Sequence, residues 1–183
     1  MTINILGKGT GWNELPNKPD GLVYGINDAC LRTHVDVTFH MHHLDEFAKQ
    51  EHSASSTRLF VQYANEHPEM EVITTRLWKE IPNAKEFPLE DIIDRFKMCY
   101  FASTVDYAIS YAIYQNAKEI RLYGINMSVN EEYREQKPGV EFWCGYAMGL
   151  GIKVIGQPLY SSLFKTRSGL LYGYLTNQWG VEQ

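Results

Sequence analysis

Short apolar runs rich in β-branched residues recur along the chain, and several of them are followed directly by glycine or asparagine. Runs of this kind, with polar or turn-forming residues at their ends, are typical of β-strands. The pattern predicts strands at 3–6, 22–26, 35–40, 71–75, 119–123 and 152–155.

Longer segments between these runs repeat their apolar residues with the period of an α-helix, which predicts helices at 56–66, 88–97, 103–117 and 140–150. The clearest stripe comprises Val105, Ala108, Ile109, Ala112 and Ile113. Ser103 and Asp106, three positions apart, predict a capping box where this helix begins.

Alternating strands and helices predict an α/β fold: a Rossmann-like, mostly parallel sheet with helices on both faces. A chain of 183 residues is long enough to bury a core of its own and is short for two domains, so we expect one domain over 1–183.

Composition narrows the range of partners. The net charge of −5 provides no broad basic surface to bind a phosphate backbone, which disfavours nucleic acid as a partner except as an acceptor in a reaction. The chain has three cysteines, an odd number, spaced far apart in apolar or helical surroundings. We expect them to be reduced packing residues of a cytoplasmic protein. No apolar run approaches the roughly 18 residues of a membrane-spanning helix, so we expect no membrane association.

The first strand runs directly into Gly7, Gly9 and Gly11, with Lys8 and Thr10 between them. Glycine allows a ligand to approach the main chain, and successive amides in such a turn can surround an anion. We therefore expect these five residues to bind the phosphate of a nucleotide. The spacing is that of neither a Walker A loop nor a full dinucleotide fingerprint, and a simple tight turn is the competing interpretation.

Two further strand ends repeat one another, since Tyr-Gly-Ile-Asn closes the strands that end at Asn27 and Asn126. In a parallel sheet ligands bind outside the carboxyl ends of the strands. We expect Asn27, Asp28 and Asn126, together with Ser103, to contact the base or ribose. Asparagine also suits turns and left-handed backbone, so a purely structural role is the alternative.

The densest group of titratable residues is His40, His42, His43 and Asp45. On a strand His40 and His42 face the same side. His42, near the exit of the third strand, is our candidate for a general base. Two imidazoles and Asp45 could alternatively bind a divalent metal, and ordinary structural histidines are the third interpretation. We assign no metal site.

Four segments, at 5–12, 23–27, 102–126 and 151–163, resemble in order the nucleotide-binding regions of bacterial lipooligosaccharide sialyltransferases and of the related 6-hydroxymethylpterin diphosphokinase-like proteins. The segments at 40–42 and 171–174 are similar to small bacteriophage proteins, which would place the protein in a host cytoplasm. The resemblance implies a Rossmann-like nucleotide-binding fold.

The same resemblance implies that Tyr133 steadies the departing phosphate, and Arg134 can do so by charge. The chain departs from the family at Lys8, Gly11 and Asn126. It also lacks the late histidine that such enzymes use as a base, because all six histidines lie at or before position 67.

These observations predict a transferase that moves a sugar from a nucleotide sugar to an acceptor hydroxyl, with no further cofactor. Two alternatives stay open: a protein that sequesters a nucleotide without chemistry, and a pyrophosphoryl transferase. The sequence also leaves open whether the chain forms a homo-oligomer.

Overall fold

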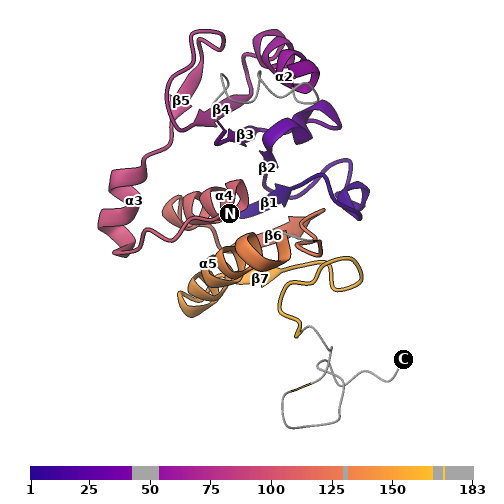
Figure 1. Ribbon diagram of the computed structural model, residues 1–183, viewed down its shortest axis with the longest axis vertical. Coiled ribbons are helices and arrows are strands. Elements are labelled where there is room, and N and C mark those ends of the chain that lie inside the picture. The colour runs from indigo at the N-terminus through magenta and orange to yellow at the C-terminus, as the bar shows by residue number, and fades with distance from the viewer. Residues whose placement is uncertain (43–53, 130–131, 167–170, 172–183) are drawn as a thin grey trace.

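The computed structural model describes residues 1–42, 54–129, 132–166 and 171 (Figure 1). Its centre is a seven-stranded sheet in the order β5-β4-β3-β2-β1-β6-β7, and every neighbouring pair is parallel. The strands are β1 (Thr2–Leu6), β2 (Leu22–Ile26), β3 (Val37–His40), β4 (Glu71–Thr74), β5 (Ala84–Glu86), β6 (Glu119–Tyr123) and β7 (Lys153–Ile155). The predicted α/β fold is confirmed, and the sheet is parallel throughout.

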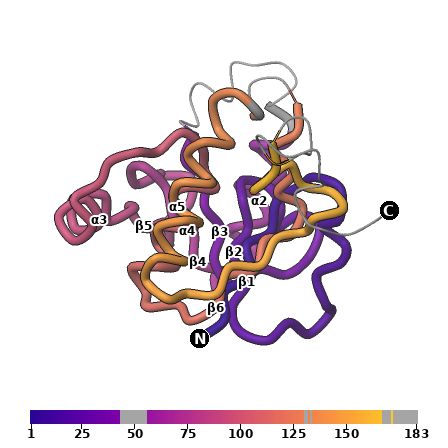
Figure 2. Tube along the Cα trace, turned by 90° about the horizontal axis from the view of Figure 1, so that it is seen from below, coloured from indigo at the N-terminus to yellow at the C-terminus, as the bar shows by residue number. Residues whose placement is uncertain are grey.

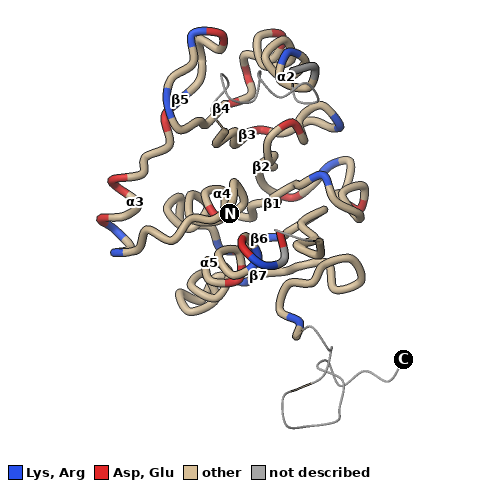
Figure 3. Tube along the Cα trace, in the orientation of Figure 1, with Lys and Arg blue, Asp and Glu red and all other residues tan. Residues whose placement is uncertain are grey.

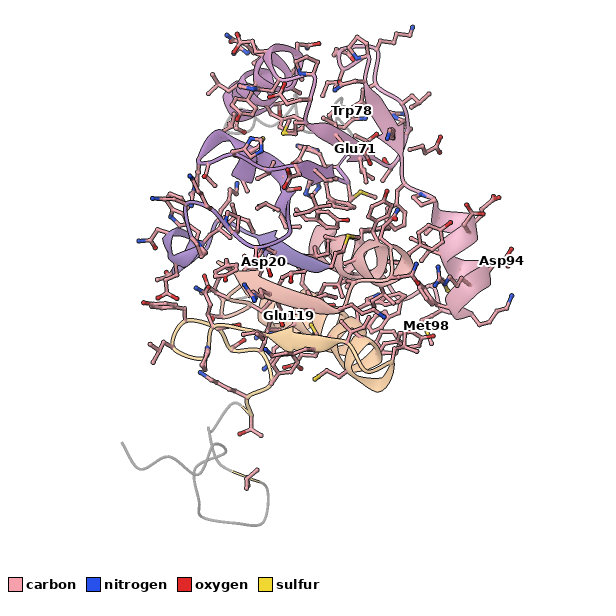
Figure 4. All side chains as sticks on the ribbon, turned by 180° about the vertical axis from the view of Figure 1, so that it is seen from behind. Asp20, Glu71, Trp78, Asp94, Met98 and Glu119 are labelled. Atoms are coloured by element: carbon pink, nitrogen blue, oxygen red, sulfur yellow. The ribbon has the colours of Figure 1, made fainter. Side chains whose placement is uncertain are left out.

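Each predicted strand lies within two residues of its observed position, whereas β5 was not predicted. This edge strand is three residues long, and Lys85 and Glu86 on it are exposed, so it has no apolar pattern to detect. Lys85 pairs with Glu71 of neighbouring β4. Figure 4 shows Glu71 near this edge, with Glu119 on β6 towards the other edge of the sheet.

Helices pack on both faces of the sheet, as predicted (Figure 2). One face carries α3 (Leu89–Phe96), α4 (Thr104–Tyr114) and α5 (Lys137–Gly149), whose buried residues share a core with Ile3, Ile5 and Ile120 of the sheet. The other face carries α2 (Ala54–Glu66) and two short 3-10 helices, η1 (Trp12–Glu14) and η2 (Asn27–Leu31). Both cores exclude water from the strands between them.

The capping box predicted at Ser103 and Asp106 is present at the start of α4. The Asp106 carboxylate accepts hydrogen bonds from the amides of Ala102 (2.5 Å) and Ser103 (2.9 Å) and from the Ser103 hydroxyl (3.1 Å). Asp106 is fully buried, and this burial raises its pKa to about 6 despite those hydrogen bonds. The box fixes the end of α4 that faces the carboxyl ends of the strands.

The prediction that all three cysteines pack in the interior is wrong for Cys99, which is exposed, whereas Cys30 and Cys144 are buried. Cys99 follows α3 in the connection to α4, where Met98 and Phe101 pack against the core and Cys99 itself is exposed. Burial raises the pKa of the Cys30 thiol to about 12. Within the described ranges, no helix combines the length and apolar character needed to cross a membrane.

Acidic and basic side chains are interspersed along the described chain (Figure 3). Many pair locally, as Glu119 does with Arg121 at 2.5 Å and with Lys153 at 3.3 Å on the β6–β7 edge. Exposed pairs of this kind contribute little to stability.

Candidate functional site

The site forms where the order of the strands reverses. The chain passes from β1 to β2 on one side, whereas β6 pairs with β1 on the other. Leu6 at the end of β1 is level with Gly25 of β2 and with Tyr123 of β6. The glycine turn and the two Tyr-Gly-Ile-Asn segments therefore meet at one edge, which is the usual place for a ligand in such a sheet.

The glycine turn is held against the end of β6. The amide of Gly7 donates to the Tyr123 carbonyl (2.8 Å), and the amide of Gly9 donates to the Gly124 carbonyl (2.9 Å). A Cβ at Gly7 would lie 2.5 Å from the Gly124 carbonyl oxygen. Close contact with β6 thus explains both glycines without a ligand. In the described structure the amides of Lys8, Thr10 and Gly11 donate to no protein group, so they remain available to an anion.

Gln157, after β7, connects this turn to β6. Its side-chain oxygen accepts from the Gly124 amide at 2.7 Å, and its nitrogen donates to the Gly11 carbonyl and to the Glu14 carboxylate, both at 2.8 Å. The residue is 8 % exposed, so the groups that it bonds to cannot readily form hydrogen bonds with water instead. This role was not predicted from the sequence.

Replacing Gln157 with alanine is expected to lower the free energy of unfolding by about 2 kcal/mol, because buried backbone groups lose their partners. Urea denaturation measures the change. Gln62→Ala is the control, since Gln62 pairs with Glu66 on the exposed surface of α2. Equal stability of the two variants would contradict the bridging role.

Asn27 joins the end of β2 to the start of α4. Its backbone is left-handed, with φ of 55°, and its side-chain oxygen accepts from the Thr104 hydroxyl at 3.3 Å. The Thr38 hydroxyl donates to its carbonyl at 3.0 Å. Asparagine tolerates left-handed backbone better than most residues, so Asn27 has a structural reason for its identity as well as a position on the site.

Asn126 connects two loops. Its side-chain nitrogen donates to the carbonyls of Thr10 and Tyr160, both at 3.1 Å. A Cβ at Gly9 would lie 1.8 Å from the Asn126 side-chain oxygen. The amide thus fastens the glycine turn and the segment after β7 to the end of β6.

Lys8 projects from the turn and pairs with Asp28 at 2.5 Å. Arg32 donates to the Lys8 carbonyl at 2.8 Å and lies over the Trp12 ring, 5.3 Å from its centre. The ring of Trp12 therefore faces Arg32. The ion pair keeps an ammonium group at the turn, where it can meet a phosphate.

His40 and His42 face the same side, with ring centres 5.8 Å apart. His40 is buried against Phe60 and Trp78, and burial lowers its pKa to about 4. Figure 4 shows Trp78 at the β4–β5 end of the molecule. The pKa of His42 is also lowered, first by partial desolvation of its ring and second by the charge of Lys8. His42 is therefore neutral at pH 7 and able to accept a proton.

Burial of His40 is expected to make the stability of the protein depend on pH. The pKa of His40 falls from 6.5 in the unfolded chain to about 4 in the folded one, so stability is complete above pH 6.5 and is lost on acidification. Relative to His40→Phe, the wild type is expected to lose about 2 kcal/mol between pH 7.5 and pH 5. Urea denaturation at both pH values measures the difference. Parallel losses in both proteins would contradict it.

These groups surround a cavity of about 250 Å³. Seven of the residues proposed from sequence line it: Gly7, Lys8, Gly9, Asn27, His42, Ser103 and Asn126. Thr10, Gly11, Asp28 and Arg134 do not; Asp28 pairs with Lys8, and Arg134 is exposed. Tyr133 lies in the π-helix η3 (Glu132–Gln136), but its side chain is outside the described part of the chain.

Sequence reasoning missed Thr104, Glu132 and Gln136, which also line the cavity. The segment before α5 is helical from Glu132 and continues into α5. Glu132 and Gln136 are four positions apart, which places both on one side of the helix. The many charged residues obscured this spacing.

No group of three or more histidine, cysteine or acidic side chains within the described ranges is arranged to hold a metal ion. Asp45, the carboxylate in the metal alternative, lies outside the described residues, as does His43.

Two solved structures of the sialyltransferase CstII from Campylobacter jejuni are similar to the chain. The complex with the substrate analogue CMP-3FNeuAc has a TM-score of 0.54 and the complex with cytidine-5'-monophosphate one of 0.52. In both, identity is 16 %, and the match covers 88 % of this chain and 84 % of the other. The chain has a sialyltransferase-like fold.

The similarity lies in the fold, since no protein-family model matches the chain and no curated protein matches its sequence. The structural match spans most of both chains.

Proposed function

We propose that the protein transfers a sugar from a pyrimidine nucleotide sugar to an acceptor hydroxyl. The observation that carries the proposal is the cavity at the carboxyl ends of β1, β2 and β6, in a fold whose solved relatives were captured with CMP and a CMP-sugar analogue. Its volume of about 250 Å³ is below the usual range for ligand sites, which favours the smaller pyrimidine base.

The phosphate lies, on this proposal, between Lys8 and the start of α4. The Lys8 ammonium supplies positive charge. Ser103 and Thr104 begin an 11-residue helix, whose amino-terminal end favours an anion. The amide of Lys8, which lines the cavity, adds a hydrogen-bond donor. Asn27 and Asn126 flank the base and ribose.

The reaction is a substitution at the anomeric carbon. The acceptor oxygen forms the new bond to that carbon, and the bond from carbon to the phosphate oxygen breaks with its electron pair remaining on phosphate. His42 takes the proton of the acceptor hydroxyl. Lys8 and the α4 terminus stabilise the charge that develops on the leaving phosphate. The products are a glycoside and the free nucleotide.

Isothermal titration calorimetry with CMP, UMP, AMP and GMP tests the binding part of the proposal. We expect CMP or UMP to bind, and Lys8→Met to weaken that binding about tenfold, which is 1.4 kcal/mol. Lys18→Met, on an exposed loop, is the control. Failure of both pyrimidine nucleotides to bind would contradict the proposal. Binding without any turnover of a nucleotide sugar would instead support a sequestering protein.

A further inference from the structure

We infer that the sugar of this donor carries no negative charge. The inference rests on the proposed function and specifies the class of substrate. Among the described residues, Lys8 and Glu132 are the charged side chains that line the cavity. Lys8 is paired with Asp28 at 2.5 Å and, on the proposed function, faces the phosphate, so it is not available to a second anionic group. The negative charge of Glu132 remains on the wall.

Other cations near the cavity are held away from it. Arg32 lies over Trp12 and donates to the Lys8 carbonyl. Lys137 is 6 % exposed, donates to the Lys165 carbonyl at 2.9 Å and lies 3.6 Å from Glu141. In the described structure, neither contributes to the cavity wall. Among the described residues, the cavity wall therefore offers no second basic side chain to pair with a second anionic group on the ligand.

The sequence around Glu132 has the same sign. The helix η3 carries two glutamates, Glu132 and Glu135, against the single Arg134. A carboxylate on the sugar would meet like charge here. Neutral sugars have hydroxyl groups, which can donate to the Glu132 carboxylate and bond with the Gln136 amide on the same side of η3. Glu132 is thus a specificity-determining residue for a neutral or amino sugar.

The test compares ligands that differ in the charge of the sugar. UDP-glucose and UDP-glucuronate have similar size and differ by one carboxylate; CDP-glucose and CDP-glucuronate form the corresponding cytidine pair. Calorimetry on the wild type, Glu132→Gln and Glu135→Gln gives the ratio of dissociation constants for the pair whose base binds. Glu135 is the matched control because it lies on η3, is exposed and does not line the cavity.

We expect the wild type to bind the nucleotide with the acidic sugar about tenfold more weakly than the nucleotide of the same base whose sugar is uncharged. In Glu132→Gln the two dissociation constants should come within about twofold of each other, a difference near the thermal energy. In Glu135→Gln the tenfold difference should remain. Equal or tighter binding of the acidic ligand by the wild type overturns the inference, and so does a gap that Glu132→Gln does not change. Either result leaves the proposed function standing, which fails if neither CMP nor UMP binds.

Discussion

Replacing His42 with asparagine is expected to slow sugar transfer by about 10²-fold or more, the usual contribution of a general base. The imidazole lines the cavity, and its lowered pKa leaves it neutral at pH 7. Asparagine retains a polar side chain but cannot take up the proton. The rate of nucleotide release from the nucleotide sugar that binds measures the loss.

Two comparisons separate this role from a structural one. His34→Asn is the control, because His34 is exposed and lies 3.7 Å from Asp36, away from the cavity wall. Nucleotide affinity and stability should change little in His42→Asn. In the wild type, the rate should fall on acidification with its midpoint below pH 6.5, since the pKa of His42 is lowered from its ordinary value of 6.5. A rate within about threefold of the wild type would exclude His42 as the base.

Replacing Gly7 with alanine is expected to have the largest effect on stability, a loss of about 3 kcal/mol in the free energy of unfolding. The new methyl group would lie 2.5 Å from the Gly124 carbonyl oxygen and 2.6 Å from Ile125. Gly124 is backbone, and the Gly7 amide is bonded to β6 at 2.8 Å, so neither side can shift without breaking the contact between β1 and β6. Chemical denaturation measures the loss.

Gly145→Ala is the matched control. Gly145 lies in α5, and a Cβ there meets nothing within 4 Å. The change should therefore stabilise the helix by about 0.5–1 kcal/mol, since alanine has the higher helix propensity. Similar losses in the two variants would show that the contact between the glycine turn and β6 is not tight.

The parallel sheet was predictable because buried strands have continuous apolar runs that local sequence records. The meeting of Gly7, Asn27 and Asn126 was also predictable, since all three follow from the rule that strand ends share one edge. The reason why each of these residues is required could not be predicted from the sequence. Gly9 is required beside Asn126, and this contact joins residues far apart in sequence.

The groups that sequence reasoning missed depend on tertiary contacts. Gln157 resembles any polar residue before a proline, and its role exists only because the segment after β7 returns to the glycine turn. Glu132 reaches the cavity because the charged segment before α5 is helical. Trp12 follows the glycine turn in sequence, but the guanidinium group of Arg32 lies over the face of its ring.

A crystal structure of the protein with CMP tests the central claim most directly. The account predicts the nucleotide in the cavity at the ends of β1, β2 and β6, with its phosphate in hydrogen-bond range of Lys8 and of the start of α4. CMP bound elsewhere, or its phosphate directed away from the glycine turn towards Glu132, would contradict the account.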